Sequence, residues 1–287
     1  MYDLRRELLS IVIPARNEAS TLPACLDSIA RSSYDARRHC PSFLHEVVVA
    51  DASSTDATRK IAANGGARVV RVPATVAIGG RGAAVRAGVD ASSGAMLLIL
   101  HADTQIAVEA LLEVRQFLLS ADETEGAKLP QHRSSGIATL RPQFIRPPCP
   151  RQRWCTTRWC ECLYWSSLER FCASHDSSFA TFGDAGCATL RVFWESVGGI
   201  PSWPLFDDVE LFRRLRLVPQ TTLRNSFMRS GRRVVKLRST ILISSRRFEK
   251  VGMARYPLLC LVLIARWFLG APPQDLALAY ERATVAR

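Results

Sequence analysis

The chain reads LLSIVIPARNE over residues 8–18, EVVVADASSTD over residues 46–56 and AMLLILHADT over residues 95–104. Each stretch opens with an apolar run typical of a buried strand and closes with polar residues. Helical patterns separate these stretches, and a further strand is expected over residues 67–72. Alternation of strands and helices indicates parallel pairing with right-handed crossovers. We therefore predict an α/β fold with a Rossmann-like, mostly parallel central sheet flanked by helices.

Polar residues follow three of these predicted strands. The sets are Arg16, Asn17 and Glu18 after the first strand, Asp51 and Ser53 after the second, and His101, Asp103 and Thr104 after the strand over 95–100. The carboxyl ends of parallel strands meet at one edge of a sheet, and ligands bind there. Chance could place one carboxylate at that edge, but three strand ends with Asp or Glu predict a ligand site.

The second half of the chain is less regular. Residues 121–135 are polar and turn-rich, which indicates an exposed loop. Residues 153–173 interleave aromatic side chains at helical spacing, and we assign that face to the core rather than to a sugar platform. The other predicted elements are a helix over 204–217, a strand over 234–244, and closing helices over 257–269 and 274–283.

Asp103 follows a buried strand, where a carboxylate can hold a divalent cation against a diphosphate. His101 would be a second metal ligand or a neighbour that orients the loop, and the alternative for Asp103 is a helix cap. Asp51 could accept hydrogen bonds from a ribose or a base edge, or it could form a turn. Asp56 is expected to cap the following helix.

Gly79, Gly80 and Gly82 surround Arg81 ahead of a predicted helix. A helix N-terminus presents free N–H groups and a positive dipole end, so this loop suits a phosphate, and Arg81 would add a charge-assisted contact. It is not a dinucleotide fingerprint, which needs glycine where Val85 stands, and no P-loop segment occurs in the chain.

Asp207 and Asp208 open the helix predicted over 204–217. Adjacent acids at a helix start are often only favourable partners of the helix dipole. The functional alternative is a general base that takes the proton from an attacking hydroxyl.

The chain has 287 residues, an ordinary globular composition and a formal net charge of +12. Positive charge favours an anionic partner: a phosphorylated small molecule, nucleic acid or an acidic membrane surface. The basic residues are scattered and no nucleic-acid-binding motif occurs, so we expect no nucleic acid partner. Five of the nine cysteines lie between Cys149 and Cys172 without a CxxC pair, which favours reduced thiols in a cytoplasmic protein over a zinc or disulfide role.

The motifs carry a resemblance to a known family. SIVIPARNE at 10–18 and VVVADASSTD at 47–56 resemble the opening of inverting glycosyltransferase family 2, whose GT-A fold is the nucleotide-diphospho-sugar transferase fold. Later segments resemble one bacterial-type subgroup, the selenodomain-associated transferase 2 proteins. These segments are GRG at 80–82, LHADT at 100–104, GD at 183–184, VGGIP at 197–201, PLFDDVEL at 204–211 and SRRFE at 245–249. The resemblance spans most of the chain and is weakest over about 120–135 and 219–230.

This resemblance implies roles for the matching residues. Pro14, Glu18 and Asp51 match positions that hold the base and ribose of the nucleotide. The expected nucleotide-sugar-binding set is Pro14, Arg16, Glu18, Asp51, Ser53, Arg81, Asp103, Arg246 and Arg247. Asp103 matches the last acid of the family's metal motif, with His101 where many members have the first acid, which implies weak metal affinity.

Asp207 and Asp208 match the family's Glu–Asp pair, whose Asp is the usual base. Arg246, Arg247 and Phe248 resemble a shortened Gln-x-x-Arg-Trp motif. Asp184 is expected on the acceptor side. Ala185 follows it where the subgroup often has Gln, and Ala50 and Ala52 flank Asp51; these departures imply a drifted choice of donor or acceptor.

We predict a glycosyltransferase that moves a sugar from a nucleotide-sugar donor to a hydroxyl acceptor in a single, inverting displacement. Asp208, paired with Asp207, is the expected base, and Mn or Mg is the expected cofactor. The alternatives are a non-catalytic nucleotide- or glycan-binding module and a nucleotidyltransferase on a related fold, although PARNEAS lacks the glycine-rich signature of the latter.

One domain is expected over residues 1–287: a nucleotide-sugar-binding half at about 8–105, an acceptor and catalytic half at about 106–250, and C-terminal helices at about 251–287. The N-terminus does not have the pattern of a signal peptide. The apolar run over 256–270 is interrupted by Arg266 and is too short for a membrane span. It predicts a helix packed on the sheet or, alternatively, a helix with one apolar face at a membrane surface.

Overall fold

The computed structural model describes residues 7–77, 80–123, 137–145, 156–174, 176, 183–217 and 234–285. The first half contains β1 (Leu8–Ala15), α1 (Leu22–His39), β2 (Leu44–Asp51), α2 (Thr58–Asn64), β3 (Arg68–Arg71), α3 (Ala74–Ala77), α4 (Gly80–Ala91), β4 (Met96–Ile99), β5 (Thr104–Ile106) and α5 (Ala110–Glu123). The second contains β6 (Ile137–Phe144), α6 (Thr156–Ser174), a short 3-10 helix (Gly183–Ala185), β7 (Cys187–Leu190), α7 (Arg191–Ser196), α8 (Asp207–Leu217), β8 (Val235–Ile243), α9 (Arg246–Val251), α10 (Arg255–Phe268) and α11 (Pro273–Val285).

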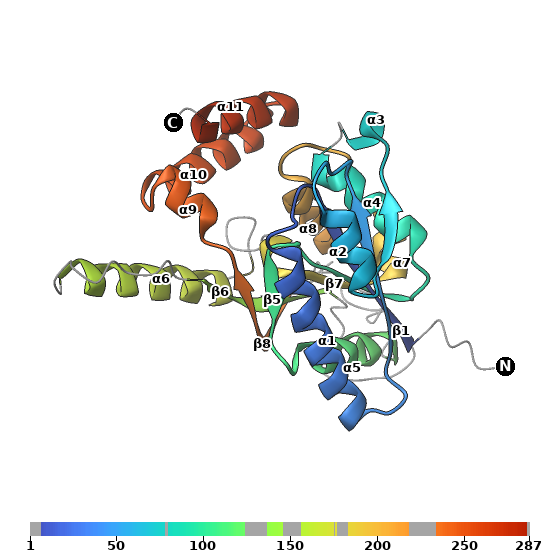
Figure 1. Cartoon of the computed structure of the whole chain (residues 1–287). Coiled ribbons are helices and arrows are strands. Elements are labelled where there is room, and N and C mark those ends of the chain that lie inside the picture. The colour runs from blue at the N-terminus through green and yellow to red at the C-terminus, as the bar shows by residue number, and fades with distance from the viewer. Residues whose placement is uncertain are drawn as a thin grey trace, which may run out of the picture.

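The described strands form a single eight-stranded sheet in the order β3-β2-β1-β4-β7-β6-β8-β5. The run β3-β2-β1-β4 is parallel throughout, as the alternation of strands and helices predicts. Beyond β4 the sheet is mixed, because β7 pairs antiparallel with both β4 and β6, and β5 pairs antiparallel with β8. The prediction of a mostly parallel central sheet flanked by helices is confirmed (Figure 1).

Apolar strands at the centre of the sheet explain its core. All four residues of β4 and nearly all of β1 are buried, as expected for strands covered on both faces. The predicted apolar face of α1 is also correct, since Leu22, Cys25, Leu26 and Ile29 are all buried. On α4, Gly88 allows the helix to approach the sheet closely, because a Cβ there would lie 2.5 Å from a methyl group of Val12.

The irregular second half matches its predicted elements in part. Helix α6 exists, and Trp165 on it is buried against Phe144 and Phe248, whereas Leu163 and Phe171 are exposed. The aromatic face therefore contributes to the core only where β6 and α9 cover it. The loop expected over 121–135 begins later than predicted, because α5 continues to Glu123, and its remaining residues lie outside the described part.

The closing helices form as predicted, but α10 does not pack on the sheet. Its buried residues Leu263 and Ile264 cluster with Phe206 and Val209 at the start of α8 and with Leu276 of α11. Figure 1 shows α9, α10 and α11 together, to one side of the sheet. In the described part of the chain, no helix combines the length and apolar character needed to cross a membrane.

Candidate active site

Asp51 ends β2 with one carboxylate oxygen lacking a partner. The side chain is 1% exposed, its Oδ2 accepts a hydrogen bond from the Ser54 N–H at 3.3 Å, and Arg59 lies 3.8 Å away. Its Oδ1 is buried without a hydrogen-bond partner among the described residues. Such an atom costs free energy unless a ligand or solvent donor reaches it. Ser53, the next predicted residue, has a φ of 58° and donates its hydroxyl to the Val72 carbonyl, so its side chain fixes the loop.

The loops after β1 and β2 are tied together by side chain to backbone hydrogen bonds. The Asn17 N–H donates to Ser54 Oγ and the Glu18 N–H donates to Thr58 Oγ1, both at 2.9 Å. Asp56 accepts from the Thr58 N–H at the first residue of α2, which is close to the predicted capping role, although the cap position itself is Ala57. These bonds hold the first two strand ends in one arrangement.

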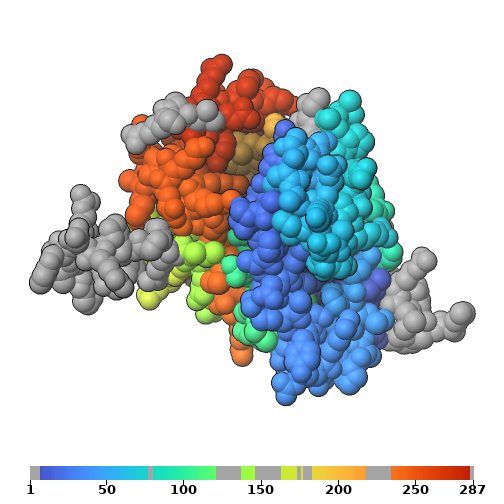
Figure 2. Space-filling view, in the orientation of Figure 1, coloured from blue at the N-terminus to red at the C-terminus, as the bar shows by residue number. Residues whose placement is uncertain are grey.

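A cavity of about 360 Å³ opens beside these strand ends. Its lining includes eight of the predicted site residues: Pro14, Arg16, Glu18, Arg81, His101, Asp103, Arg246 and Arg247. Figure 2 shows the hollow between the N-terminal half of the molecule, in blue, and the C-terminal helices, in orange and red. Asp51 and Ser53 do not line this cavity and lie at the neighbouring strand end, on β2.

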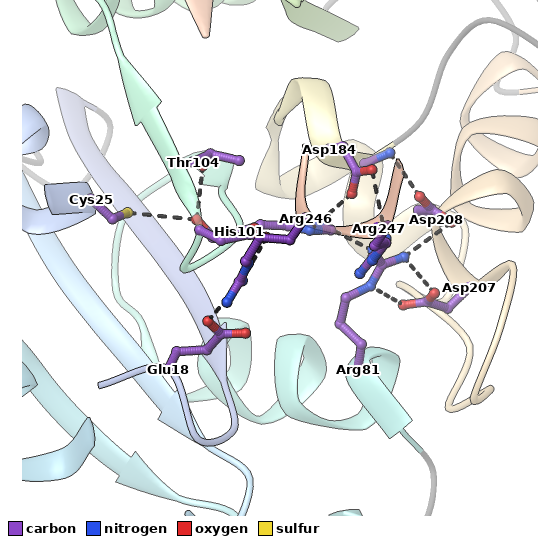
Figure 3. A network of polar contacts seen from close by, with 12 residues as sticks. Glu18, Cys25, Arg81, His101, Thr104, Asp184, Asp207, Asp208, Arg246 and Arg247 are labelled. Atoms are coloured by element: carbon purple, nitrogen blue, oxygen red, sulfur yellow. Dashed lines mark hydrogen bonds and ion pairs between the residues drawn. The ribbon is translucent and has the colours of Figure 1, made fainter. Parts of the chain in front are cut away.

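Arg246 crosses the cavity to reach two acids of the other half. Its Nη2 lies 3.2 Å from Glu18 Oε2 (Figure 3). The same Nη2 lies 3.0 Å from Asp103 Oδ2. Burial would lower the pKa of Arg246, but the hydrogen bond to Asp103 and the charge of Glu18 outweigh it and raise the pKa. The strand-end carboxylates therefore already hold a cation, in the form of a guanidinium.

Arg81 joins the glycine-containing segment to the acidic pair on α8. Its side chain forms two hydrogen bonds to Asp207, at 2.6 and 3.1 Å, and its Nη2 lies 3.1 Å from Asp208 Oδ1. Arg81 belongs to the first turn of α4, and Gly82 beside it has a packing role, because a Cβ there would overlap the Pro201 carbonyl oxygen. Residues 78–79 of the predicted phosphate loop lie outside the described part.

The two acids on α8 have different surroundings. Asp207 is 2% exposed and burial raises its pKa despite the Arg81 charge, whereas Asp208 is 14% exposed. Burial also opposes ionisation of Asp208, but the Arg81 charge and a 2.7 Å hydrogen bond donated by the Gly183 N–H lower its pKa below the ordinary value. Asp208 is therefore the more reachable carboxylate and the one held in its charged form.

His101 links Arg81 on α4 to Asp184. Its Nε2 lies 2.9 Å from Arg81 Nη1 and its Nδ1 lies 3.0 Å from Asp184 Oδ1. An arginine side chain can only donate hydrogen bonds, so His101 Nε2 accepts from Arg81. His101 Nδ1 therefore carries the ring proton and donates a hydrogen bond to Asp184 Oδ1. Burial raises the pKa of Asp184, but His101 and the Arg247 charge 3.9 Å away outweigh it and leave the pKa well below its ordinary range.

The donor set for a divalent metal is partly suitable. Asp103 and Glu18 both line the cavity and offer the carboxylate oxygens that Mg and Mn favour as ligands. Within the described ranges, however, no three metal-binding side chains converge. His101 would have to release Arg81 or Asp184 before either ring nitrogen could bind a metal. These residues therefore fit a metal bound by carboxylate and shared with a phosphorylated ligand, rather than a preformed protein cage.

Two features of the site were not predictable from strand-end patterns. The Gly183 N–H donates to Asp208, and nothing in the sequence singles out a backbone donor in that position. Helix α9 reaches across the cavity, so that Arg246 contacts Glu18, which lies 228 residues earlier in the chain. Of the five cysteines between Cys149 and Cys172, Cys149 and Cys155 lie outside the described residues, as do the side chains of Cys160 and Cys162, and Cys172 is a buried free thiol.

Solved structures identify the fold. TarS residues 1–349 from S. aureus superpose on this chain with a TM-score of 0.54 at 15% identity, and the match covers 93% of this chain and 68% of that one. TarS is a GT-A glycosyltransferase, and this chain has the same fold class.

A family model described as Glycosyl transferase family 2 matches residues 10–153, and the chain belongs to that family. Two relatives are similar in sequence. The mouse dolichyl-phosphate beta-glucosyltransferase is 36% identical over 107 residues, covering 36% of this chain and 33% of that protein. The Mycobacterium tuberculosis PGL/p-HBAD biosynthesis glycosyltransferase is 39% identical over 116 residues, covering 39% of this chain and 41% of that protein. The matched part thus spans only a third to two fifths of these relatives.

Proposed function

We propose that this chain is an inverting glycosyltransferase that transfers a sugar from a nucleotide-diphosphate sugar to an acceptor hydroxyl. One observation carries the proposal: a cation-rich cavity at the carboxyl edge of the parallel strands lies beside an acidic pair that Arg81 holds in place. Family membership supports the same class of reaction. A nucleotide- or glycan-binding module without activity, and a nucleotidyltransferase, would not need an ionised, partly exposed Asp208 beside the cavity.

The nucleotide is assigned to the edge formed by β1 and β2. The unpartnered Oδ1 of Asp51 would accept a donor from the base or the ribose. Arg81, Arg246 and Arg247 line the cavity and would face the diphosphate, because guanidinium groups match phosphate oxygens in pairs. The cavity therefore presents positive charge where an anionic leaving group would gain charge.

Asp208 does not line the cavity itself, but it is assigned as the base because it is held in its charged form, is partly exposed and lies 3.1 Å from Arg81, which does line the cavity. It would take the proton of the acceptor hydroxyl as that oxygen bonds to the anomeric carbon, while the bond to the nucleoside diphosphate breaks on the opposite face. Asp207 is buried and doubly bonded to Arg81, so we assign it a positioning role. Asp184, held by His101, is assigned to the acceptor side.

Asp103, with Glu18, would hold a divalent Mn or Mg ion. Such an ion would neutralise charge on the diphosphate oxygens when bound. The Arg246 guanidinium now occupies the space between these carboxylates, so we expect it to turn toward the diphosphate when the metal enters. TarS has been solved in complex with UDP-GlcNAc, which makes a nucleotide sugar a reasonable first ligand to test here.

Donor binding is tested by calorimetry with a panel of nucleoside diphosphates, with and without manganese. Binding should occur for one nucleotide, and manganese should tighten it in the native protein but not in Asp103→Ala. Asp27→Ala, an exposed acid on α1, serves as the matched control. Equal manganese-dependent affinity in Asp103→Ala would remove Asp103 from the metal site.

Turnover is tested by release of nucleoside diphosphate from the bound donor in the presence of an acceptor panel. Asp208→Asn should bind the donor as tightly as the native chain and lose about a hundredfold to ten-thousandfold in rate. If the native chain binds donor and releases nothing with any acceptor, the non-catalytic module becomes the better description. If Asp208→Asn keeps its rate, the base is another acid.

A further inference from the structure

Helix α10 has two apolar faces, and among the residues that the structure describes only one of these faces is covered. Leu263 and Ile264 are buried against α8 and α11. The other face exposes large apolar side chains, with Leu258 62% and Leu269 87% exposed. The exposed residues are Leu258, Leu261, Val262 and Phe268 on the helix and Leu269 at its C-cap. At about 100° per residue these five fall within one third of the helix circumference, so they form a single stripe, named here the α10 stripe.

Arginines border this stripe along one side. Arg255 and Arg266 are both exposed and lie three turns apart, about 20° from each other around the helix and next to Val262 on the helical wheel. No acidic residue occurs on α10. The whole segment over 246–269 carries five basic residues and one acid, and that acid, Glu249, accepts a hydrogen bond from Ser245. Helix α11 adds one basic and two acidic residues, so the C-terminal helices stay positive.

A row of exposed apolar side chains bordered by arginines matches the interfacial layer of a lipid bilayer. Leucine and phenylalanine side chains would enter the acyl boundary, while arginine side chains extend to the headgroups. Positive charge along the edge complements anionic lipid. An apolar protein partner, or a second copy of this chain, would cover the stripe equally well but would not explain why its border is basic and free of acids.

We infer that the α10 stripe, with Arg255 and Arg266, docks on an anionic lipid surface, with α10 lying in the plane of the interface. Only residues 252–254 separate α10 from α9, whose Arg246 and Arg247 line the cavity. Docking would therefore bring the bilayer close to the cavity. Binding to lipid does not depend on the proposed transfer reaction, so either conclusion can fail while the other stands.

The test is flotation with vesicles of phosphatidylcholine, alone or mixed with phosphatidylserine, at low and high salt. The native chain should float with the mixed vesicles at low salt and less at high salt. Leu258→Ser/Leu269→Ser should lower the fraction bound by about tenfold or more, because two exposed apolar contacts are lost. Arg255→Gln/Arg266→Gln should bind the mixed vesicles more weakly and lose most of the salt dependence.

The control is Tyr34→Ser, which removes an equally exposed apolar side chain from α1 and should float like the native chain. All variants should keep the native melting temperature, which shows that a lost interaction is not lost folding. Absence of flotation at low salt, or unchanged flotation of Leu258→Ser/Leu269→Ser, overturns the inference. So does a concentration-dependent dimer in sedimentation that those two substitutions dissolve, since a second copy would then cover the stripe.

Discussion

Replacing Arg81 with methionine should destabilise the protein strongly, because it leaves a buried carboxylate without its partner. The Arg81 guanidinium lies 2.6 Å from Asp207 and 3.1 Å from Asp208. At an effective dielectric constant near 20, Coulomb attraction at these distances is about 6 and about 5 kcal/mol. Desolvation of Arg81, whose side chain is 27% exposed, offsets part of this attraction. Removing one partner of a buried pair typically costs about 3–5 kcal/mol, and we expect Arg81→Met to fall in that range.

Two measurements distinguish loss of the ion pair from nonspecific destabilisation of the Arg81→Met variant. Asp207→Asn added to Arg81→Met should recover part of the stability, because the more deeply buried of the two uncompensated carboxylates is then neutral. The loss should also shrink as the pH falls. Burial already raises the pKa of Asp207, and without Arg81 it should rise further. Since the folded state then binds a proton that the unfolded chain releases, stability increases as the pH falls through the folded-state pKa toward the unfolded value of about 4.

Urea unfolding of the single and double variants at several pH values measures both effects. Arg86→Met is the matched control on the same helix, because Arg86 donates to the carbonyl oxygens of Gly198 and Ile200 and forms no ion pair with a carboxylate of the described residues. The stability lost in Arg86→Met should not change with pH, and adding Asp207→Asn should not restore it. If Arg81→Met costs less than about 1 kcal/mol, or if Asp207→Asn fails to restore stability, the buried pair does not hold this part of the site together.

Three further predictions concern the site and the core. Asp51→Ala should weaken nucleoside diphosphate binding by about tenfold to a hundredfold in calorimetry, as expected for loss of a hydrogen bond to a charged group. Gly183→Ala places a Cβ 2.9 Å from the Asp208 carboxylate. It should therefore lower turnover about tenfold or more while donor affinity stays unchanged, and a normal rate would mean that Asp208 tolerates displacement. Burial raises the pKa of Cys25 and of Cys187 to about 12, so neither thiol should be alkylated at neutral pH in the native protein, as read by mass spectrometry.

Local patterns predicted the first half of the fold well, because each strand there is apolar along its length and ends in a polar set. The run β3-β2-β1-β4 and the buried face of α1 follow from those patterns. The antiparallel strand β7 does not, since Cys187–Leu190 is too short to show its direction. Pairing direction depends on contacts between segments far apart in the chain, which a local pattern does not contain.

The candidate site divides in the same way. Residue type and position at a strand end were enough to predict that Glu18, His101 and Asp103 line one site. The partners of these residues were not predictable: the sequence indicates a metal at Asp103, whereas in the protein Arg246 lies against that carboxylate. Whether a cation at this position is a metal or a guanidinium depends on how α9 crosses the cavity, a feature of the tertiary structure.

The antiparallel placement of β7 has a consequence for exchanging parts between related enzymes. Ile99 at the end of β4 pairs with Cys187 at the start of β7, so the chain enters β7 where it leaves β4. A chimera that keeps residues 8–106 and takes the remainder from a relative would cut through two charge clusters at that point. Arg81 would meet an unfamiliar acidic pair and His101 an unfamiliar partner in place of Asp184. A working chimera must therefore take Arg81 and its acidic pair from the same parent, and likewise His101 and Asp184. The sequences around these residues can differ.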